Sequence, residues 1–255
     1  MHNNSRIYVL SGSASGIGRA TKELLVSQGH RVIGVDLREA DVIADLGTPA
    51  GRDLMIDQVT KKSRGKVDAL LAVAGVDIAG PPTIAINYYG ALATLEGLRP
   101  LLLKSSAPRA VAVSSITSVH PFDQQLLDAM LDGTEEEALQ RAEVASYSYA
   151  TSKRALSRWI RRVAVNAEWA GSGIPLNAVA PGLVKTELLS RLFADPDKKR
   201  AIEAGSPMPL GGPFEPLAAA QLLAWLASEE NGHMTGQTIF IDGGADVVIR
   251  GDSTW

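Results

Sequence analysis

A tyrosine and a lysine four residues apart are the first candidates for chemistry in this chain. If the segment YSYATSK is helical, Tyr149 and Lys153 share one face of the helix. The lysine ammonium would then favour the phenolate and lower the pKa of Tyr149 from about 10. Such a tyrosine can exchange a proton with an alcohol or a carbonyl oxygen near neutral pH. The pair alone also fits a packed tyrosine beside a lysine whose stem covers apolar surface, so its meaning depends on the rest of the chain.

A glycine-rich segment, LSGSASGIG, supplies a candidate nucleotide site. Gly12, Gly16 and Gly18 have the spacing G-x3-G-x-G, which allows a tight turn and close approach of the backbone to a pyrophosphate at a helix N-terminus. An ordinary strand-to-helix turn would explain the same residues. Asp36 favours the nucleotide, because a carboxylate at the end of the next strand can bond the adenosine ribose hydroxyls and repels a 2′-phosphate. We therefore predict NAD rather than NADP as the cofactor, with Arg38 softening that preference.

The elements that must position these residues follow from the hydrophobic pattern. Short apolar runs alternate with amphipathic stretches of helical length. The expected strands are 7–11, 31–36, 69–74, 110–114, 175–180 and 238–242, and the expected helices are 18–28, 49–63, 88–104, 148–170 and 215–228. This alternation predicts one α/β domain over residues 1–255, with a doubly wound parallel sheet and helices on both faces.

Two segments interrupt the alternation. Residues 121–145 indicate one or two extra helices inserted before the helix of Tyr149. Residues 183–213 form a long connection, and in a compact domain such a connection commonly covers a binding site. We expect this segment to be a substrate lid.

Composition excludes several other classes of function. The net charge of −3 offers no basic excess for nucleic acid or an anionic membrane. The absence of cysteine excludes disulfides, thiolate zinc sites and a thiol nucleophile, and it fits a cytoplasmic protein. Four scattered histidines make a zinc site a poor expectation. No apolar run has the length of a membrane span, and the first residues lack the pattern of a signal peptide.

Further polar residues stand at the ends of expected strands, where open α/β sheets place their ligands. Ser115 follows one strand, Asn87 lies near a helix start, Gly75 ends the segment AVAG, and Pro181-Gly182 and Thr186 follow a later strand. Each of these has an ordinary structural explanation as a helix cap or a turn. Their order on one α/β chain is more informative than any one of them.

Taken together, these motifs resemble the short-chain dehydrogenase/reductase family in its single-domain, Rossmann-like form, from Ile7 to Gly244. The segment AVAG stands where NNAG is common in the family, and Ser11 stands where threonine is frequent. The long gap between Ser115 and Tyr149, with the segments VIGVDLREADVIADL and IDGGADVVIRG, is similar to bacterial 3α-hydroxysteroid dehydrogenase/carbonyl reductases.

The resemblance implies a role for each matching position. Tyr149 would be the general acid/base, Lys153 would lower its pKa and hold the nicotinamide ribose, Ser115 would orient the substrate oxygen, and Asn87 would hold a water in a proton relay. The reaction would be reversible hydride transfer between NAD(H) and a secondary alcohol or ketone, without a metal. The residues implied in cofactor binding are Ser11, Gly12, Ser15, Gly16, Ile17, Gly18, Asp36, Leu37, Asp45, Leu46, Ala74, Gly75, Tyr149, Lys153, Pro181, Gly182, Val184 and Thr186.

The substrate and the assembly are less constrained. The apolar residues of the 183–213 segment are Leu183, Leu188, Leu189, Leu192, Phe193, Met208 and Pro209, and Val76, Ile116, His120 and Phe122 could line the opposite side. These residues favour a bulky apolar substrate, such as a hydroxysteroid, a terpenoid or an aromatic alcohol. The resemblance implies a homo-oligomer, and we expect a dimer. A non-catalytic NAD-binding sensor or scaffold stays open as an alternative, as does a related dehydratase or epimerase.

Overall fold

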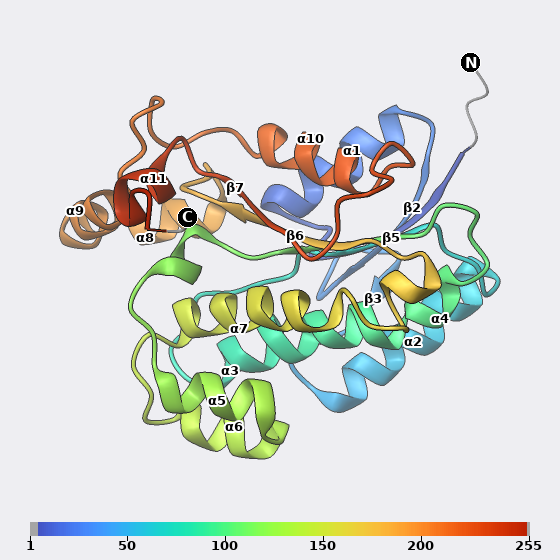
Figure 1. Cartoon of the computed structure of the whole chain (residues 1–255), viewed down its shortest axis with the longest axis horizontal. Coiled ribbons are helices and arrows are strands. Elements are labelled where there is room, and N and C mark those ends of the chain that lie inside the picture. Colours follow the sequence, from blue (N-terminus) through green and yellow to red (C-terminus); the bar gives the residue numbers. More distant parts are fainter. Residues whose placement is uncertain (1–4, 254–255) are drawn as a thin grey trace.

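A seven-stranded parallel sheet forms the centre of the protein (Figure 1). The computed structural model describes residues 5–253. Its strands are β1 Ile7–Ser11, β2 Arg31–Asp36, β3 Val42–Ile43, β4 Ala69–Ala72, β5 Arg109–Val113, β6 Leu176–Pro181 and β7 Thr238–Ile241. The strand order is β3-β2-β1-β4-β5-β6-β7, so the chain changes direction across the sheet between β1 and β4. Ligands of such sheets bind at this switch point, outside the carboxyl ends of the strands.

Helices cover both faces of the sheet, which confirms the predicted fold class (Figure 1). On one face α1 Gly16–Ser27 packs against α10 Pro216–Leu226. On the other lie α2 Pro49–Ser63, a long helix that runs from Pro81 to Leu102, and α7 Ser148–Val163. The strands are buried on both sides because alternate residues feed two cores: Val9 and Leu70 belong to one, Leu10 and Leu71 to the other.

The 121–145 segment contains two helices, α5 Gln124–Asp132 and α6 Glu135–Ala142 (Figure 1). Leu126, Leu127 and Met130 of α5 are buried in the same core as α7. The buried Arg52 on α2 donates to both carboxylate oxygens of Glu135 at 2.7 Å, which fixes α6 to the body of the protein. Helix α5 therefore covers a face of α7 that would otherwise be exposed, and α6 packs on α5 and on the start of the helix that begins at Pro81.

The 183–213 segment also carries two helices, α8 Glu187–Phe193 and α9 Pro196–Gly205. A short helix, α11 Ala245–Arg250, follows β7 near them (Figure 1). A parallel bridge between Val184 and Phe214 closes the base of this segment. No helix within residues 5–253 has the length and apolar character needed to cross a membrane.

Several boundaries differ from the expectations. The two-residue strand β3 was not expected, because it is too short to produce a pattern. The helix expected over 88–104 begins at Pro81 and contains two π-helical segments, η1 Ala85–Gly90 and η2 Ala93–Gly97. The helix expected to reach residue 170 ends at Val163, and the chain then turns so that Trp169 packs edge-on against Trp159, with ring centres 6.3 Å apart.

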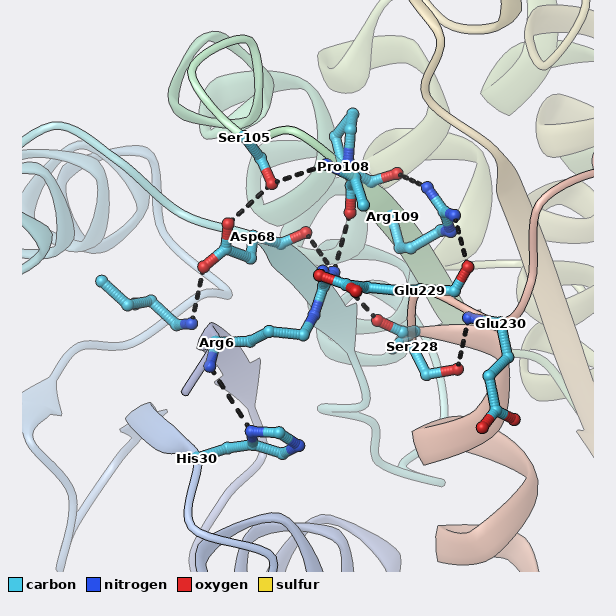
Figure 2. A network of polar contacts seen from close by, with 12 residues as sticks. Arg6, His30, Asp68, Ser105, Pro108, Arg109, Ser228, Glu229 and Glu230 are labelled. Atoms are coloured by element: carbon cyan, nitrogen blue, oxygen red, sulfur yellow. Dashed lines mark hydrogen bonds and ion pairs between the residues drawn. The ribbon is translucent and has the colours of Figure 1, made fainter. Parts of the chain in front are cut away.

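A network of polar contacts around Arg6, Asp68 and Glu229 joins the amino ends of β1, β4 and β5 (Figure 2). It lies at the opposite end of β1 from the glycine loop. Arg6 lies just before β1 and is only 5% exposed. Its guanidinium donates to the carbonyl oxygens of Asp68 at 3.1 Å and Ala107 at 2.8 Å, and it pairs with Glu229 at 3.1 Å. The Asp68 carboxylate in turn accepts the backbone N–H of Ile7 at 2.8 Å. These bonds tie β1, β4 and β5 together before the sheet begins.

Candidate active site

One elongated cleft of about 1370 Å³ runs along the carboxyl edge of the sheet. It begins at the glycine loop, passes the ends of β2, β4 and β5, and ends beneath α8 and α9. The predicted site residues that line it are Gly12, Ser15, Gly16, Ile17, Gly18, Asp36, Leu37, Asp45, Leu46, Ala74, Gly75, Ser115, Tyr149, Lys153, Pro181, Gly182, Val184 and Thr186. Ser11 and Asn87 do not line it, and both are buried behind it.

The glycine loop is built for close backbone packing. Gly12 has φ +73°, and a Cβ there would lie 2.7 Å from the Cα of Ala74. A Cβ at Gly18 would lie 1.9 Å from the carbonyl oxygen of Gly12. Side chains at these two positions would therefore separate the loop from the end of β4 and from the start of α1. The resulting shallow cradle at a helix N-terminus suits a pyrophosphate.

Ser11 acts behind this cradle, which differs from its expected place in the cofactor site. Its hydroxyl accepts the backbone N–H groups of Val73 at 3.2 Å and Ala74 at 3.4 Å. The segment AVAG, which lacks the asparagines common in similar chains, is thus held to β1 by this serine.

Asp36 ends β2 at the far side of the loop. One carboxylate oxygen accepts the N–H of Ala14 at 2.9 Å, and the other accepts the N–H of Leu37 at 2.7 Å. Each oxygen can accept a further bond, so the carboxylate can still bind two hydroxyl groups. Arg38 and Asp45 line the same end of the cleft.

Tyr149, Lys153 and Ser115 meet where β5 ends. Tyr149 lies in the first turn of α7, and the Nζ atom of Lys153 lies 5.8 Å from the centre of its ring. The same Nζ donates to the carbonyl oxygen of Val113 at 2.9 Å. Ser115 caps the short helix η3 Ile116–Val119 and its side chain hydrogen-bonds to Tyr149. The common face expected for Tyr149 and Lys153 is thus confirmed.

The two serines after β5 have different roles. The Ser114 hydroxyl donates to the carbonyl oxygen of Lys153 at 3.1 Å and bonds the Ser157 hydroxyl at 2.8 Å. These contacts commit Ser114 to holding α7 against the sheet. Ser115 remains as the serine whose side chain meets Tyr149 in the cleft.

The pKa of Tyr149 differs from the expectation based on its spacing to Lys153. Burial raises the pKa of Tyr149 to about 12; the hydrogen bond from Ser115 opposes the increase, and the negative charge of Asp77 adds to it. Burial also lowers the pKa of Lys153 to about 8. Without cofactor, the net pKa of Tyr149 is therefore raised and not lowered as expected, because burial is the dominant effect on this phenol.

The side chain of Asn87 makes three hydrogen bonds within the protein. It lies in η1, where its Oδ1 accepts the N–H of Val76 at 2.8 Å and its Nδ2 donates to the carbonyl oxygen of Val76 at 2.9 Å and to the Ser152 hydroxyl at 3.1 Å. The side chain is completely buried. It therefore fixes the loop after β4 from behind the cleft wall.

The far end of the cleft is mostly apolar. Its apolar lining residues are Val76, Ile116, Leu183, Leu188, Leu189 and Leu192. Four of the apolar residues expected here, namely Phe122, Phe193, Met208 and Pro209, do not line the cleft. Phe122 instead packs under the guanidinium of Arg154, whose Cζ lies 4.0 Å from the ring centre. Asp77 and Thr117 also line the cleft, and no motif marked either of them.

Comparison with known proteins places this geometry in a family. The curated 3-alpha-hydroxysteroid dehydrogenase/carbonyl reductase of Comamonas testosteroni is 38% identical over 96% of this chain and 98% of its own length. The chain belongs to the short-chain dehydrogenase/reductase family. Residues 136–246 also match the family model described as enoyl-(acyl carrier protein) reductase. As a member of the family, the protein is an oxidoreductase that acts on an alcohol or a ketone.

Other members of the short-chain dehydrogenase/reductase family are similar over most of their length. The 3beta-hydroxysteroid dehydrogenase 1 of Eggerthella lenta is 28% identical over 92% of each chain. The crystal structure of a 3-alpha-hydroxysteroid dehydrogenase from Pseudomonas sp. B-0831, complexed with NADH, superposes with a TM-score of 0.90 at 38% identity, covering 96% of this chain and 99% of that one. The predicted resemblance is thereby confirmed.

Proposed function

We propose that the protein is an NAD(H)-dependent dehydrogenase/reductase that acts on bulky apolar secondary alcohols and ketones. The observation that carries the proposal is the meeting of Tyr149, Ser115 and Lys153 at the end of β5, in one cleft with the glycine loop. A proton-transfer group and a nucleotide cradle in one cleft are what hydride transfer to a carbonyl needs.

The residues of the cleft fit an NAD molecule. The Gly12–Gly18 turn would take the pyrophosphate, and Asp36 would bind the adenosine ribose with the oxygens that still have acceptor capacity. Asp45 and Leu46 would flank the adenine, and Val184 and Thr186 would contact the carboxamide. The similar Pseudomonas enzyme was solved with NADH, which supports this choice. When bound, NAD(H) supplies the acceptor or the donor of the hydride.

The protein's own groups handle the proton and the substrate oxygen. Tyr149, with a pKa raised to about 12, holds its proton at neutral pH and can donate it to a carbonyl oxygen as that oxygen gains negative charge. Ser115 bonds to Tyr149 and is placed to donate to the same oxygen. In alcohol oxidation these roles reverse, and Tyr149 must first lose its proton. The ammonium of Lys153, on the same face of α7, favours the tyrosinate needed for that direction.

The apolar far end of the cleft supports the choice of substrate class. Leucines from α8 and from the segment before it line this end together with Val76 and Ile116, so an alicyclic or aromatic skeleton would bury apolar surface there. Two similar proteins are hydroxysteroid dehydrogenases by name. We therefore propose hydroxysteroids first, with terpenoid and aromatic alcohols as alternatives. The 183–213 segment would serve as the lid over this end.

A coupled set of assays tests the proposal. Purified protein is given NAD or NADP and a panel of 3α- and 3β-hydroxysteroids, terpenols and phenyl alcohols, and nicotinamide reduction is followed by absorbance. We expect turnover with NAD on one class of these alcohols. Tyr149→Phe should lower kcat by about 100-fold or more while NAD binding, measured by calorimetry, stays close to wild type. A Tyr149→Phe enzyme that keeps most of its rate would show that Tyr149 is not the proton donor.

We also propose that the protein assembles as a homodimer through a face other than α7, since α5 packs over that helix. Light scattering at micromolar concentration tests this assembly. A monomer or a tetramer would contradict it.

A further inference from the structure

An acidic side chain stands without a partner in the apolar half of the cleft. Asp77 follows the loop after β4 and lines the cleft. Within residues 5–253 its carboxylate makes no hydrogen bond and no ion pair. It lies close enough to Tyr149 for its charge to raise the pKa of that phenol. Desolvation in the cleft raises the pKa of Asp77, and no neighbouring cation counteracts the increase, although the residue as a whole is exposed to solvent.

The backbone on both sides of Asp77 is held by fully buried side chains. Asn87 bonds both the N–H and the carbonyl oxygen of Val76, at 2.8 and 2.9 Å. Thr83 accepts the N–H of Ile78 at 2.9 Å and donates to its carbonyl oxygen. Asn87 and Thr83 are both 0% exposed. The peptide that carries Asp77 is therefore fixed at both ends, while the carboxylate that it presents has nothing to bind in the protein.

We propose that Asp77 is a specificity residue that binds a hydrogen-bond donor on the substrate, either a second hydroxyl or an amino group near the reacting carbon. The inference rests on the proposed alcohol/ketone chemistry. A purely apolar substrate would displace water from this carboxylate without replacing its hydrogen bonds. This uncompensated desolvation would weaken substrate binding. A hydroxyl or an ammonium would replace the lost water with a charge-assisted hydrogen bond. Asp77 and Tyr149 line the same cleft and the Asp77 charge acts on the Tyr149 phenol, so the donor is proposed on the side of the reacting carbon.

The same geometry disfavours acidic substrates at this position. A substrate carboxylate near Asp77 would place two negative charges in a partly desolvated cleft, and like charges there are strongly disfavoured. The structure therefore predicts an order of kcat/KM among substrate derivatives. Amino and hydroxyl derivatives should have the highest values, methyl derivatives lower values and carboxylate derivatives the lowest.

Matched decalinols test this order. Each carries the reacting hydroxyl and, one to three carbons away, a methyl, hydroxyl, amino or carboxylate group. For the best positional isomer, we expect kcat/KM at pH 7 to be at least tenfold higher for the amino than for the methyl compound, and at least tenfold lower for the carboxylate. Asp77→Asn should lower the amino-to-carboxylate ratio at least tenfold. Asp53→Asn, which removes the same charge from the exposed surface of α2, should leave the ratio unchanged.

The outcomes separate the two proposals. If the ratio of kcat/KM for the amino compound to kcat/KM for the carboxylate compound is the same within twofold in Asp77→Asn and wild type, the proposed role of Asp77 is overturned. If no decalinol is turned over, calorimetric binding of the same compounds to the protein with NADH gives the ratio directly. A ratio that still depends on Asp77 then supports the specificity role and counts against the proposed reaction alone. Asp77→Ser replaces Asp77→Asn if melting shows that the first variant is unfolded.

Discussion

Replacing Asn87 by alanine tests whether this side chain is a structural anchor. The change removes three hydrogen bonds of a fully buried side chain and takes the Asn87 partner from the N–H and the carbonyl oxygen of Val76, which is half-buried. A typical hydrogen bond contributes about 0.5–1.5 kcal/mol net, so the three together imply a loss of about 1.5–4.5 kcal/mol. For a chain of this size, each 1 kcal/mol lowers Tm by roughly 2–4 °C. We therefore expect Tm to fall by at least about 3 °C.

The measurement is calorimetric melting of Asn87→Ala beside Asn166→Ala. Asn166 is exposed and its side chain makes no hydrogen bond within residues 5–253, so the same change there should leave Tm almost unmoved. Because the anchor also fixes Gly75 and Asp77, kcat for Asn87→Ala should fall as well. An Asn87→Ala protein that melts with wild type but has lost its activity would refute the anchoring argument and favour a direct part in proton relay.

Two further predictions follow from the site. Gly12→Ala puts a side chain at φ +73° and a Cβ 2.7 Å from the Cα of Ala74. The backbone conformation alone costs about 1–2 kcal/mol, so we expect at least tenfold weaker NAD binding by calorimetry. Wild-type affinity in this variant would contradict the proposed fit of the glycine loop to the pyrophosphate. The pH dependence should differ with direction: since burial raises the pKa of Tyr149 to about 12, ketone reduction, which uses the protonated phenol, should keep its rate from neutral into mildly alkaline buffer, whereas alcohol oxidation should rise with pH. Reduction that rises with pH would argue against Tyr149 as the acid.

The parts of the fold that periodicity controls could be predicted from the sequence. The strand 7–11 and the helix 49–63 were expected at the bounds that the structure shows, because the apolar pattern and Pro49 at the helix start are local signals. The π-helical segments after Pro81 and the early end of α7 depend on tertiary packing, such as the contact of Trp169 with Trp159, and no local pattern reports them. The short β3 pairs only with the end of β2 and has no pattern of its own.

The candidate site shows the same division. The spacing of Tyr149 and Lys153 could place both on one face, because helical geometry is local. Spacing could not predict that burial raises the pKa of Tyr149 and lowers the pKa of Lys153, since burial is set by the whole fold. The hydrogen bonds of Ser11 and Asn87 go to the loop after β4, which lies near these residues only in the folded protein, so local sequence patterns could not predict them. Asp77 belongs to no motif, and only the cleft reveals that its charge has no partner.

The charged network at the amino edge has a kinetic consequence. It joins residues that are far apart in the chain, since Arg6 reaches Glu229 and the carbonyl oxygens of Asp68 and Ala107. Contacts with such sequence separation can form only after the strands have found their register, so they should be absent from the folding transition state. Losing them would then accelerate unfolding and leave the refolding rate almost unchanged. Stopped-flow denaturant jumps on Arg6→Met should show this asymmetry, which would make the far edge of the sheet the part that sets the lifetime of the folded enzyme.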